Sequence, residues 1–336
     1  MPKHTLVLIP GDGIGPEVSS AARRVLDAAG LDAQWIEVPA GAVAIEQGHD
    51  NVLPSLTLDA IRRHKIALKG PVTTPVGKGF KSVNVQLRQK LGLYAAVRPV
   101  RTMAGVKTRF DNVDMVIIRE NTEGLYTGIE AEITPGVVTS LKVATEAACT
   151  RIARYAFRYA QQRGRKKVTA FHKANIMKLT DGMFIACAQR VHADEFPQIQ
   201  YEERIIDAGC MKIVQEPTQF DVLLMENLYG DLVSDLCAGL VGGLGVTPGA
   251  NIGDDYAVFE AVHGSAPDIA GQNKANPLAM IISGVMMLNH IGETELAEKV
   301  KSAYNAQLAD GKEITYDLGG RCGTREFADA LIRRLK

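Results

Sequence analysis

Short apolar runs alternate along the chain with stretches in which apolar residues recur every three to four positions. This alternation is typical of α/β proteins in which helices cover a largely parallel sheet. The run Thr5–Ile9 predicts the first strand, and a helix opened by Pro16 and closed by Gly30 follows it. Further strands are predicted at Gln34–Val38, Ile66–Lys69, Val113–Arg119, Val168–Phe171, Gln200–Ile206 and Asp221–Met225, and long helices at Val143–Arg163, Pro277–Ile291 and Glu295–Ala309.

One segment departs from this pattern. Residues Ala131–Leu141 carry Thr134-Pro135-Gly136 between β-branched residues, which predicts a hairpin. The chain shows no internal repeat, low-complexity tract or linker. A second lobe would therefore be joined closely to the first.

Composition narrows the class of protein. With 336 residues, 46% hydrophobic and 23% charged, the chain is long enough for two lobes and ordinary for a globular protein. Its 38 Lys and Arg balance 38 Asp and Glu, so it lacks the basic surface of a nucleic-acid binder. The most apolar stretch, Leu278–Leu288, is too short to span a membrane.

The five cysteines are scattered and form no CxxC pair, and the first residues lack the pattern of a secretory signal. We therefore expect reduced thiols and a cytoplasmic location.

A glycine-rich turn, Gly11–Glu17, follows the first strand. Its spacing is G-x-G-x-G and it contains an acid, whereas dinucleotide-binding Rossmann proteins have G-x-G-x-x-G. The turn therefore excludes a Rossmann fold and fits a tight connection between strand and helix.

Three arginines lie near predicted strand ends: Arg88, Arg98 and Arg119. Guanidinium groups bind carboxylates through two hydrogen bonds, so the set suits a ligand with several carboxylates. Ser82 and Asn84 could add neutral hydrogen bonds. Ordinary surface arginines are the alternative.

Asp231 and Asp235 are four residues apart, so on a helix they share one face. Aspartate oxygens suit Mg²⁺ or Mn²⁺, and the apolar surroundings disfavour an unneutralised pair. A solvated acidic helix face is the alternative.

Three further features carry less information alone. Lys173 closes a strand and could act as a base, and Tyr126 could act as an acid, although each residue type is more often structural or solvated. The small residues of His263–Gly271, followed by Asn276, could let the backbone approach a flat cofactor or could form a plain surface loop.

Taken in chain order, these segments resemble the metal-dependent β-decarboxylating dehydrogenases of isocitrate, homoisocitrate and 3-isopropylmalate over nearly the whole chain. The matching segments are Gly11–Glu17, Lys69-Gly70-Pro71 with Thr73-Thr74-Pro75, Arg88, Arg98, Arg119, Tyr126, Lys173-Ala174-Asn175, Asn227–Asp235 and His263–Asn276. The resemblance implies an α/β fold with two lobes and a mixed central sheet. It implies a large domain of residues 1–93 and 242–336, and a small domain of residues 94–241 with a dimer clasp near 127–142.

The resemblance also implies residue roles in a homodimer with shared active sites. Tyr126 and Lys173 would be catalytic, and Mg²⁺ or Mn²⁺ would be bound by Asp231, Asp235 and Asp207, with Lys173 and Asp207 coming from the partner chain. The substrate would contact Ser82, Asn84, Arg88, Arg98 and Arg119. The cofactor would contact Thr74, His263, Gly264, Ser265, Ala266, Asp268, Ile269, Asn276 and Asp317.

Within this family, the polar pair Ser82 and Asn84 favours isocitrate over homoisocitrate and 3-isopropylmalate. This chain has Asp268 and Ile269 at positions where NADP-dependent members of the family that it resembles carry Lys and Tyr, and this difference favours NAD. Tyr316 points the other way, because it resembles a tyrosine that binds the additional phosphate of NADP in those members. A non-catalytic regulatory subunit of a heteromeric isocitrate dehydrogenase is the alternative of another class. The retained catalytic residues argue against it.

Overall fold

A computed structural model describes residues 2–73 and 81–336, so the predicted cofactor residue Thr74 lies outside the described residues. The chain divides into two compact units. Unit 1 comprises Met1–Gly92, Thr102–Arg109 and Val241–Lys336, and unit 2 comprises Leu93–Arg101 and Phe110–Leu240. The short segment Thr102–Arg109 belongs to unit 1, although the sequence placed it in the small domain.

Within the described residues of unit 1, five strands follow the order β2-β1-β3-β12-β11, and among these five the antiparallel pair is β11 with β12. The strands are β1 (His4–Ile9), β2 (Ala33–Glu37), β3 (Ile66–Lys69), β11 (Pro248–Ile252) and β12 (Ala257–Ala261). The helices are α1 (Gly15–Ala29), α2 (Ala42–Glu46), α3 (Ser55–His64), α4 (Val83–Lys90), α9 (Leu278–His290), α10 (Thr294–Asp310) and α11 (Thr324–Arg334).

Helix α1 shows why these residues fold as they do. Pro16 lies in its first turn, and Gly30 ends it in the left-handed conformation with φ of 109°, as predicted. The predicted apolar stripe is buried in full: Val18, Ala22, Val25 and Ala29. Helix α1 packs through this face against α9 and α11.

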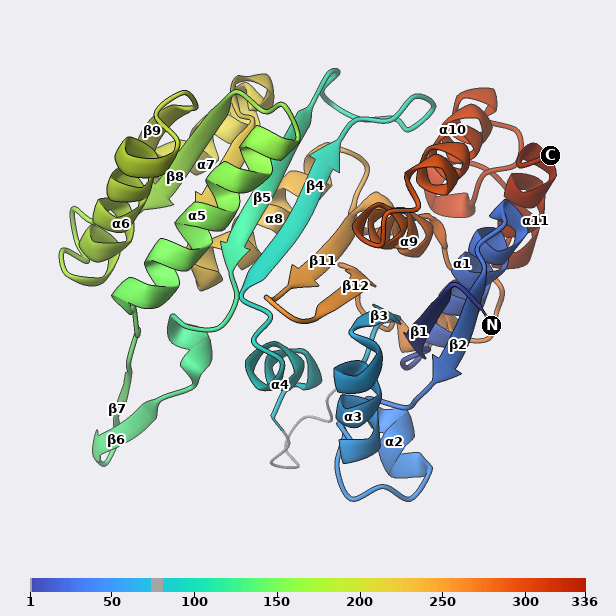
Figure 1. Cartoon of the computed structure of the whole chain (residues 1–336), viewed down its shortest axis with the longest axis horizontal. Coiled ribbons are helices and arrows are strands. Elements are labelled where there is room, and N and C mark those ends of the chain that lie inside the picture. Colours follow the sequence, from blue (N-terminus) through green and yellow to red (C-terminus); the bar gives the residue numbers. More distant parts are fainter. Residues whose placement is uncertain (1, 74–80) are drawn as a thin grey trace. The chain divides into compact units, whose positions relative to one another are not determined.

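In unit 2, five strands lie side by side in one sheet in the order β4-β5-β10-β8-β9, with β4 antiparallel to β5 and the others parallel. Helices α5 and α6 cover one face of these strands and α7 and α8 the other (Figure 1). The strands are β4 (Ala95–Arg101), β5 (Asp114–Glu120), β8 (Lys167–His172), β9 (Gln200–Ile205) and β10 (Val222–Met225), and the helices are α5 (Glu146–Gln162), α6 (Thr180–Glu195), α7 (Ile206–Gln215) and α8 (Asn227–Leu240).

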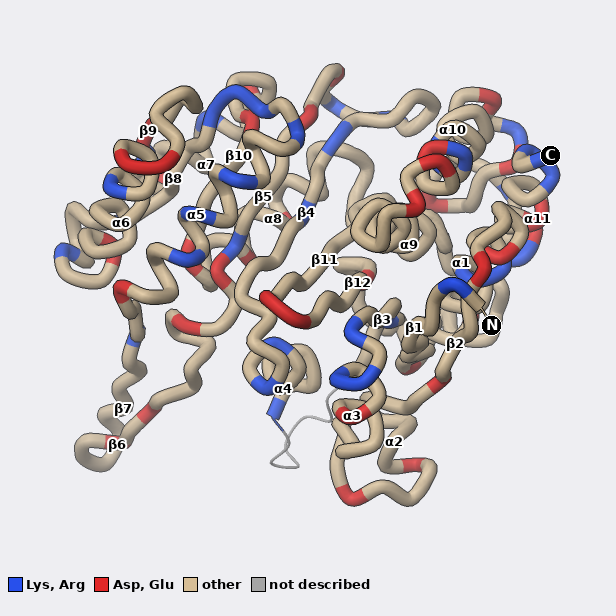
Figure 2. Tube along the Cα trace, viewed as in Figure 1, with Lys and Arg blue, Asp and Glu red and all other residues tan. Residues whose placement is uncertain are grey.

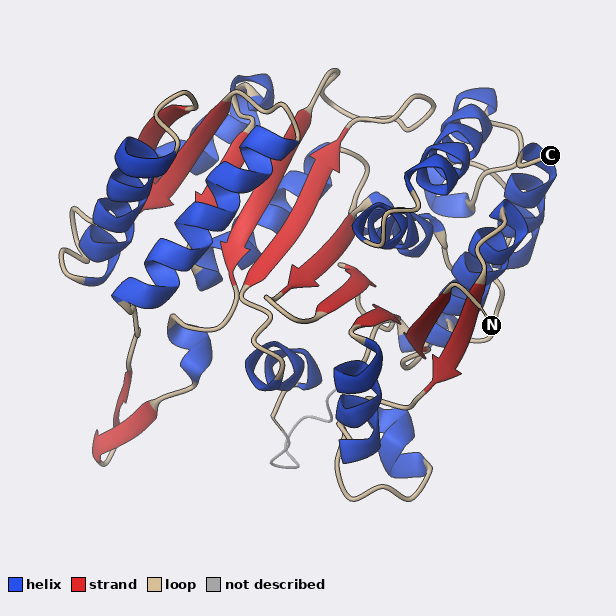
Figure 3. Cartoon of the chain, viewed as in Figure 1, coloured by secondary structure: helices blue, strands red, loops and turns tan. Residues whose placement is uncertain are grey.

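The predicted hairpin is confirmed as β6 (Glu130–Thr134) and β7 (Val137–Ser140). Figures 1 and 3 show it projecting from the rest of unit 2. All nine strand residues are exposed, including the apolar Ile133 and Val138. Exposed apolar side chains on a projecting hairpin are typical of a surface that another chain covers.

All seven strands and four helices predicted from the sequence occur in the structure. The largest shift in a boundary is at α5, which begins at Glu146 instead of Val143. Thr145 sets this start because its side chain accepts a hydrogen bond from the backbone N–H of Ala148.

Basic and acidic residues are interspersed along both units, in keeping with the balanced charge (Figure 2). Among residues 2–73 and 81–336, no helix combines the length and apolar character that crossing a membrane requires.

Candidate active site

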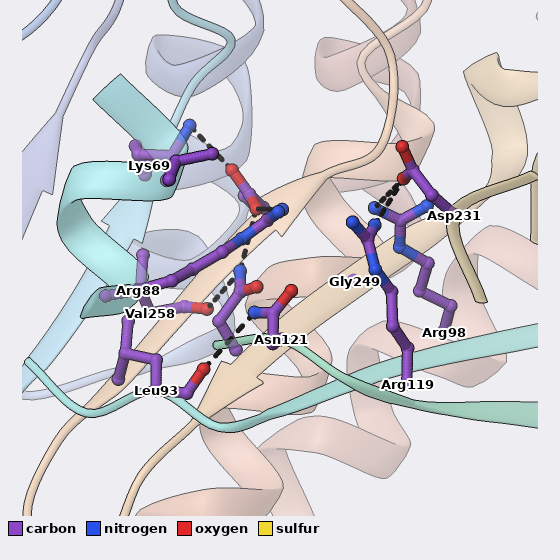
Figure 4. A network of polar contacts seen from close by, with 12 residues as sticks. Lys69, Arg88, Leu93, Arg98, Arg119, Asn121, Asp231, Gly249 and Val258 are labelled. Atoms are coloured by element: carbon purple, nitrogen blue, oxygen red, sulfur yellow. Dashed lines mark hydrogen bonds and ion pairs between the residues drawn. The ribbon is translucent and has the colours of Figure 1, made fainter. Parts of the chain in front are cut away.

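Unit 2 brings most of its predicted site residues into one group, which we call the Asp231 cluster: Arg98, Arg119, Tyr126, Asn227, Asp231 and Asp235. Arg119 is completely buried; its Nε and Nη2 donate to Asn227 Oδ1 at 3.0 and 2.7 Å, and its Nη1 donates to Asp231. Arg98 lies 3.4 Å from each of the Asp231 and Asp235 carboxylates. Figure 4 shows the guanidinium groups of Arg98 and Arg119 turned toward Asp231.

Two features of the sequence fix the position of helix α8 beside Arg119. The Glu226 carboxylate accepts hydrogen bonds from the backbone N–H groups of Leu228 (3.3 Å) and Tyr229 (3.0 Å) in the first turn. A Cβ atom at Gly230 would lie 2.5 Å from Arg119 Cγ, so glycine is needed for α8 to pack on the arginine. Both features hold the Asp231 carboxylate beside the arginines.

The Tyr126 hydroxyl donates a hydrogen bond to Asp231, and its ring lies 5.0 Å from the Arg119 guanidinium carbon. Burial, together with the hydrogen bond and negative charge of Asp231, raises the pKa of Tyr126. The phenol is therefore protonated at neutral pH and can act as a proton donor.

Asp231 and Asp235 form a pair of carboxylates on one face of α8, as predicted. Burial raises the pKa of Asp235; Arg98 counteracts this rise, and Asp231 adds to it. Their oxygens suit Mg²⁺ or Mn²⁺, and the mutual repulsion is relieved when a cation binds. In the described part of the chain, no group of three His, Cys, Asp or Glu side chains could hold a metal.

The structure does not bring Lys173 and Asp207 into this cluster. Lys173 Nζ lies 2.8 Å from Asp207 Oδ1, and the hydrogen bond from the lysine lowers the pKa of Asp207. Two very exposed apolar residues, Ile176 and Leu179, follow Lys173 in the chain. The pair therefore lies on an uncovered surface of unit 2.

Sequence reasoning missed three charged residues that support this region. Asp181 accepts a hydrogen bond from the backbone N–H of Lys173 at 2.6 Å, and Lys142 Nζ lies 2.5 Å from the same carboxylate. Lys142 Nζ is also 3.8 Å from Glu226, which caps α8. Each is an isolated charge in the sequence, and only the fold brings the three together.

Unit 1 holds the third predicted arginine in a separate buried network. The Glu260 carboxylate is 2.6 Å from Lys69 Nζ, 3.7 Å from Arg88 Nη2 and 2.7 Å from the donor Asn251 Nδ2. Burial alone would raise the pKa of Glu260, but Lys69 and Arg88 lower it to about 2. Sequence reasoning missed Glu260 because it did not predict strand β12.

The predicted polar pair lies at the start of α4. The Ser82 hydroxyl oxygen caps the helix by accepting from Val85 N at 3.5 Å. Asn84 Oδ1 is buried and has no hydrogen-bond partner within the described residues. Unsatisfied buried polar atoms are rare, so Asn84 is a candidate for contact with a bound molecule.

Unit 1 also contains a cavity of about 270 Å³ that includes many of the predicted cofactor residues. It is lined by Ile14, Gly245, His263, Gly264, Ala266, Ile269, Lys274, Ala275, Asn276 and Asp317. His263 Nε2 is buried without a partner among the described residues, and burial lowers the pKa of this histidine. A neutral ring with an unused nitrogen and a mostly apolar wall fit a planar organic cofactor.

The loops around this cavity are held in specific conformations. Asn276 Nδ2 donates to Asp317 at 2.9 Å, and Asn276 Oδ1 accepts from the backbone N–H of Leu278, the first residue of α9, at 2.9 Å. Ala266 has φ of 37°, in the left-handed region that alanine rarely adopts. Asp268 is exposed beside this strained residue.

Curated relatives match nearly the whole chain. "Isocitrate dehydrogenase [NAD] catalytic subunit 5, mitochondrial" from Arabidopsis thaliana is 52% identical and covers 98% of this chain and 88% of its own length. A mitochondrial protein from Dictyostelium discoideum, named as a regulatory subunit of NAD isocitrate dehydrogenase, is 49% identical, with 98% and 91% covered. The relatives thus include subunits named as catalytic and as regulatory.

The names of these relatives contradict the cytoplasmic location expected from the sequence, because they describe mitochondrial proteins. The expectation was wrong for a physical reason. Scattered, unpaired cysteines indicate that a protein resides in a reducing compartment, but they do not indicate which reducing compartment it is.

A solved structure, "Crystal structure of isocitrate dehydrogenase from Methylococcus capsulatus", is 50% identical, has a TM-score of 0.95 and covers 99% of each chain. The family model "Isocitrate/isopropylmalate dehydrogenase" matches residues 5–331. The predicted fold class, a mixed α/β arrangement distinct from the Rossmann fold, is confirmed. This chain belongs to the isocitrate/isopropylmalate dehydrogenase family.

Proposed function

We propose that this chain catalyses the oxidative decarboxylation of isocitrate with reduction of NAD⁺. The observation that carries the proposal is the Asp231 cluster, in which two arginines, a protonated tyrosine and two carboxylates meet on one side of unit 2. This combination supplies carboxylate binding, a proton donor and hard oxygen ligands in one place.

The chain's own residues divide the work as follows. Arg98 and Arg119 hold substrate carboxylates and limit their motion, which favours the reactive orientation. Lys173 accepts the proton of the substrate hydroxyl, and Tyr126 delivers a proton to the carbon that has lost CO₂. The raised pKa of Tyr126 supports its role as the acid.

This chain has residues suited to binding both the metal ion and the cofactor that the reaction requires. Asp231 and Asp235 would hold Mg²⁺ or Mn²⁺, and the cavity around His263 and Asn276 would hold NAD⁺. When bound, the metal supplies Lewis-acid chemistry for decarboxylation and NAD⁺ supplies the hydride acceptor.

Isocitrate is proposed over the related acids because of Ser82 and Asn84. The Asn84 side-chain NH₂ and the Ser82 hydroxyl can donate hydrogen bonds to a carboxylate, whereas the branched alkyl group of 3-isopropylmalate accepts none. Names of relatives that specify isocitrate dehydrogenase support the same substrate.

We further propose that two copies of the chain share their active sites. Helices α7 and α8 pack together and expose four apolar side chains: Met211, Val214, Leu232 and Leu236. Ile176 and Leu179, which follow Lys173 in the chain, are likewise exposed, and apolar surface of this kind indicates an interface. A second copy on this surface would bring its Lys173 and Asp207 to the carboxylate pair of Asp231 and Asp235.

The alternative is a regulatory role in a heteromeric enzyme, and the Dictyostelium relative with a regulatory name gives it weight. A regulatory chain needs no intact acid, base and carboxylate pair. Tyr126, Lys173, Asp207, Asp231 and Asp235 are all present here, which supports a catalytic role.

The deciding experiment uses the purified chain alone, with isocitrate, Mn²⁺ and either NAD⁺ or NADP⁺. We expect turnover with NAD⁺, a dimer by light scattering, and slower reaction with homoisocitrate and 3-isopropylmalate. An inactive chain that becomes active only with a different subunit would contradict the catalytic homodimer and support the regulatory alternative.

The cofactor assignment has its own test. Asp268→Lys with Ile269→Tyr should shift the ratio of kcat/KM toward NADP⁺ by about a hundredfold, because a carboxylate repels the additional phosphate and lysine attracts it. A wild type that prefers NADP⁺, or a ratio that does not change, would contradict this assignment.

A further inference from the structure

Asp12, in the glycine-rich turn after β1, has an unusual set of hydrogen bonds. Its buried carboxylate accepts three backbone N–H groups: Ala42 at 3.0 Å, Val43 at 2.8 Å and Thr73 at 2.5 Å. Ala42 and Val43 begin α2, whereas Thr73 lies in the loop after β3. Asp12 therefore ties together two segments that are distant in the sequence.

The same turn contacts the loop that lines the proposed cofactor cavity. Ile14 N donates to Ser265 O at 2.8 Å, and the hydroxyl oxygens of Thr73 and Ser265 are 2.6 Å apart. Ile14 itself lines the cavity, as do His263, Gly264 and Ala266 on either side of Ser265. Ser265 is thus held from two sides, by Ile14 and by Thr73, and Asp12 holds Thr73.

Close packing explains the glycines around this acid. Gly13 has φ of 60°, and a Cβ atom there would lie 2.0 Å from Ser265 O. A Cβ atom at Gly41 would lie 1.9 Å from Asp12 Oδ2. Neither position accepts a side chain while the carboxylate and the Ser265 loop keep their places.

These contacts also explain why a negatively charged residue, Asp12, can lie in a turn near the proposed site of a cofactor that carries phosphates. Three N–H donors surround the Asp12 carboxylate, so its charge is directed at the backbone. Hydrogen bonds to an ionised carboxylate are stronger than those between neutral groups.

We propose that Asp12 is a positioning residue for the cofactor cavity, fixing Thr73 and through it Ser265; this rests on the proposed function. Asp12→Asn keeps the size of the side chain but replaces one acceptor oxygen with an NH₂ donor. That donor would face an N–H group of Ala42, Val43 or Thr73, and the loop would lose its fixed position.

The first measurement is the affinity for NADH, followed by its fluorescence without turnover. In Asp12→Asn we expect the Kd for NADH and the KM for NAD⁺ to rise about tenfold, as for the loss of one charge-assisted hydrogen bond. The KM for isocitrate and kcat at saturating NAD⁺ should stay within about twofold of wild type.

Asp221→Asn is the matched control. The Asp221 carboxylate likewise accepts two backbone N–H groups, from Lys166 at 2.6 Å and Lys167 at 3.1 Å, but lies in unit 2. It should lower Tm and leave the Kd for NADH unchanged. Equal weakening of NADH binding by both variants would overturn the proposal, since the effect would then be general destabilisation.

Thr73→Val gives an independent test that does not depend on Asp12→Asn folding. It keeps the backbone N–H group that donates to Asp12 and removes the hydroxyl that is hydrogen-bonded to Ser265, so the affinity for NADH should fall by a few-fold. Unchanged affinity in Thr73→Val, or in a folded Asp12→Asn, overturns the proposal. If the wild-type protein does not bind NADH, the proposed function is contradicted, and the positioning role of Asp12, which rests on it, is contradicted as well.

Discussion

Arg119 and Lys69 are long cations whose side chains are almost completely removed from water, with 0% and 2% of their surface exposed. Each faces a carboxylate: Arg119 faces Asp231 and Lys69 faces Glu260. Burying an unpaired charge is very unfavourable, so each carboxylate is needed for the stability of the fold.

Glu260→Gln tests this dependence in unit 1. The variant leaves Lys69 and Arg88 without their shared carboxylate, and we expect the free energy of unfolding to fall by about 3–5 kcal/mol at pH 7. Because the pKa of Glu260 is lowered to about 2, its stabilisation is complete above the ordinary pKa of 4.5 and is lost as pH falls toward 2.

Urea unfolding of both proteins between pH 7 and pH 2.5 is the measurement. The difference between them should be constant above about pH 5 and shrink below it. Glu298→Gln is the control, because Glu298 is an exposed carboxylate paired with Lys301 and should change little at any pH. A difference that does not depend on pH would contradict the pairing.

The two proposed substrate contacts at helix α4 also lie at its start, because Ser82 caps the helix and Asn84 lies in its first turn. Replacing both with leucine would therefore mix loss of substrate contacts with loss of the cap. Asn84→Leu alone separates the two effects.

For Asn84→Leu we expect kcat/KM for isocitrate to fall by about 2–4 kcal/mol in transition-state terms, as when a buried polar partner of a charged group is lost. Ser82→Thr keeps both hydroxyl and cap and should resemble wild type. Activity on 3-isopropylmalate, measured in parallel, should not fall. Unchanged efficiency of Asn84→Leu on isocitrate would show that its carboxylates are bound elsewhere.

Secondary structure could be predicted where one physical signal acted alone. Strand β3 is uniformly apolar apart from its terminal Lys69, and its predicted bounds are confirmed. Strand β4 was missed because it contains Pro99 between two arginines, and proline lacks the N–H group that a central strand donates. Helix α6 was missed because exposed apolar residues such as Met183 blur its stripe.

Site residues could likewise be predicted where a local sequence motif contained them, and not where tertiary packing alone brings them together. Arg119, Tyr126 and Asp231 were identified from motifs, and the structure brings them together. Glu260 and Asp181 were not identified, because a single acid in a short strand or at a helix start carries no local pattern. Their partners come from elements distant in the chain, which only tertiary packing reveals.

Across the whole molecule, the shared-site proposal makes a strong prediction about mixtures of inactive variants. Lys173→Met and Tyr126→Phe should each be inactive as pure proteins. After the copies exchange partners, half of the dimers would contain one copy of each, and one of their two sites would be intact. Equal mixing should therefore restore about one quarter of wild-type activity.

A second mixture supplies the control. Lys173→Met with Asp207→Asn should show no recovery, because both groups reach a site from the same copy and every site in the mixed dimer has one defect. Mass spectrometry verifies exchange in both mixtures. Exchange without recovery in the first mixture would contradict shared sites.

The path of the chain through the two units has a consequence for biosynthesis. Strand β3 pairs with β12, which joins residues 66–69 to residues 257–260, whereas the strands of unit 2 all lie between residues 95 and 225. On the ribosome, unit 2 is complete before unit 1 receives β11, β12 and its last three helices. Until then β3 is an unpaired strand edge, the kind of surface on which nascent chains aggregate, so this step of synthesis is where a chaperone would protect the chain.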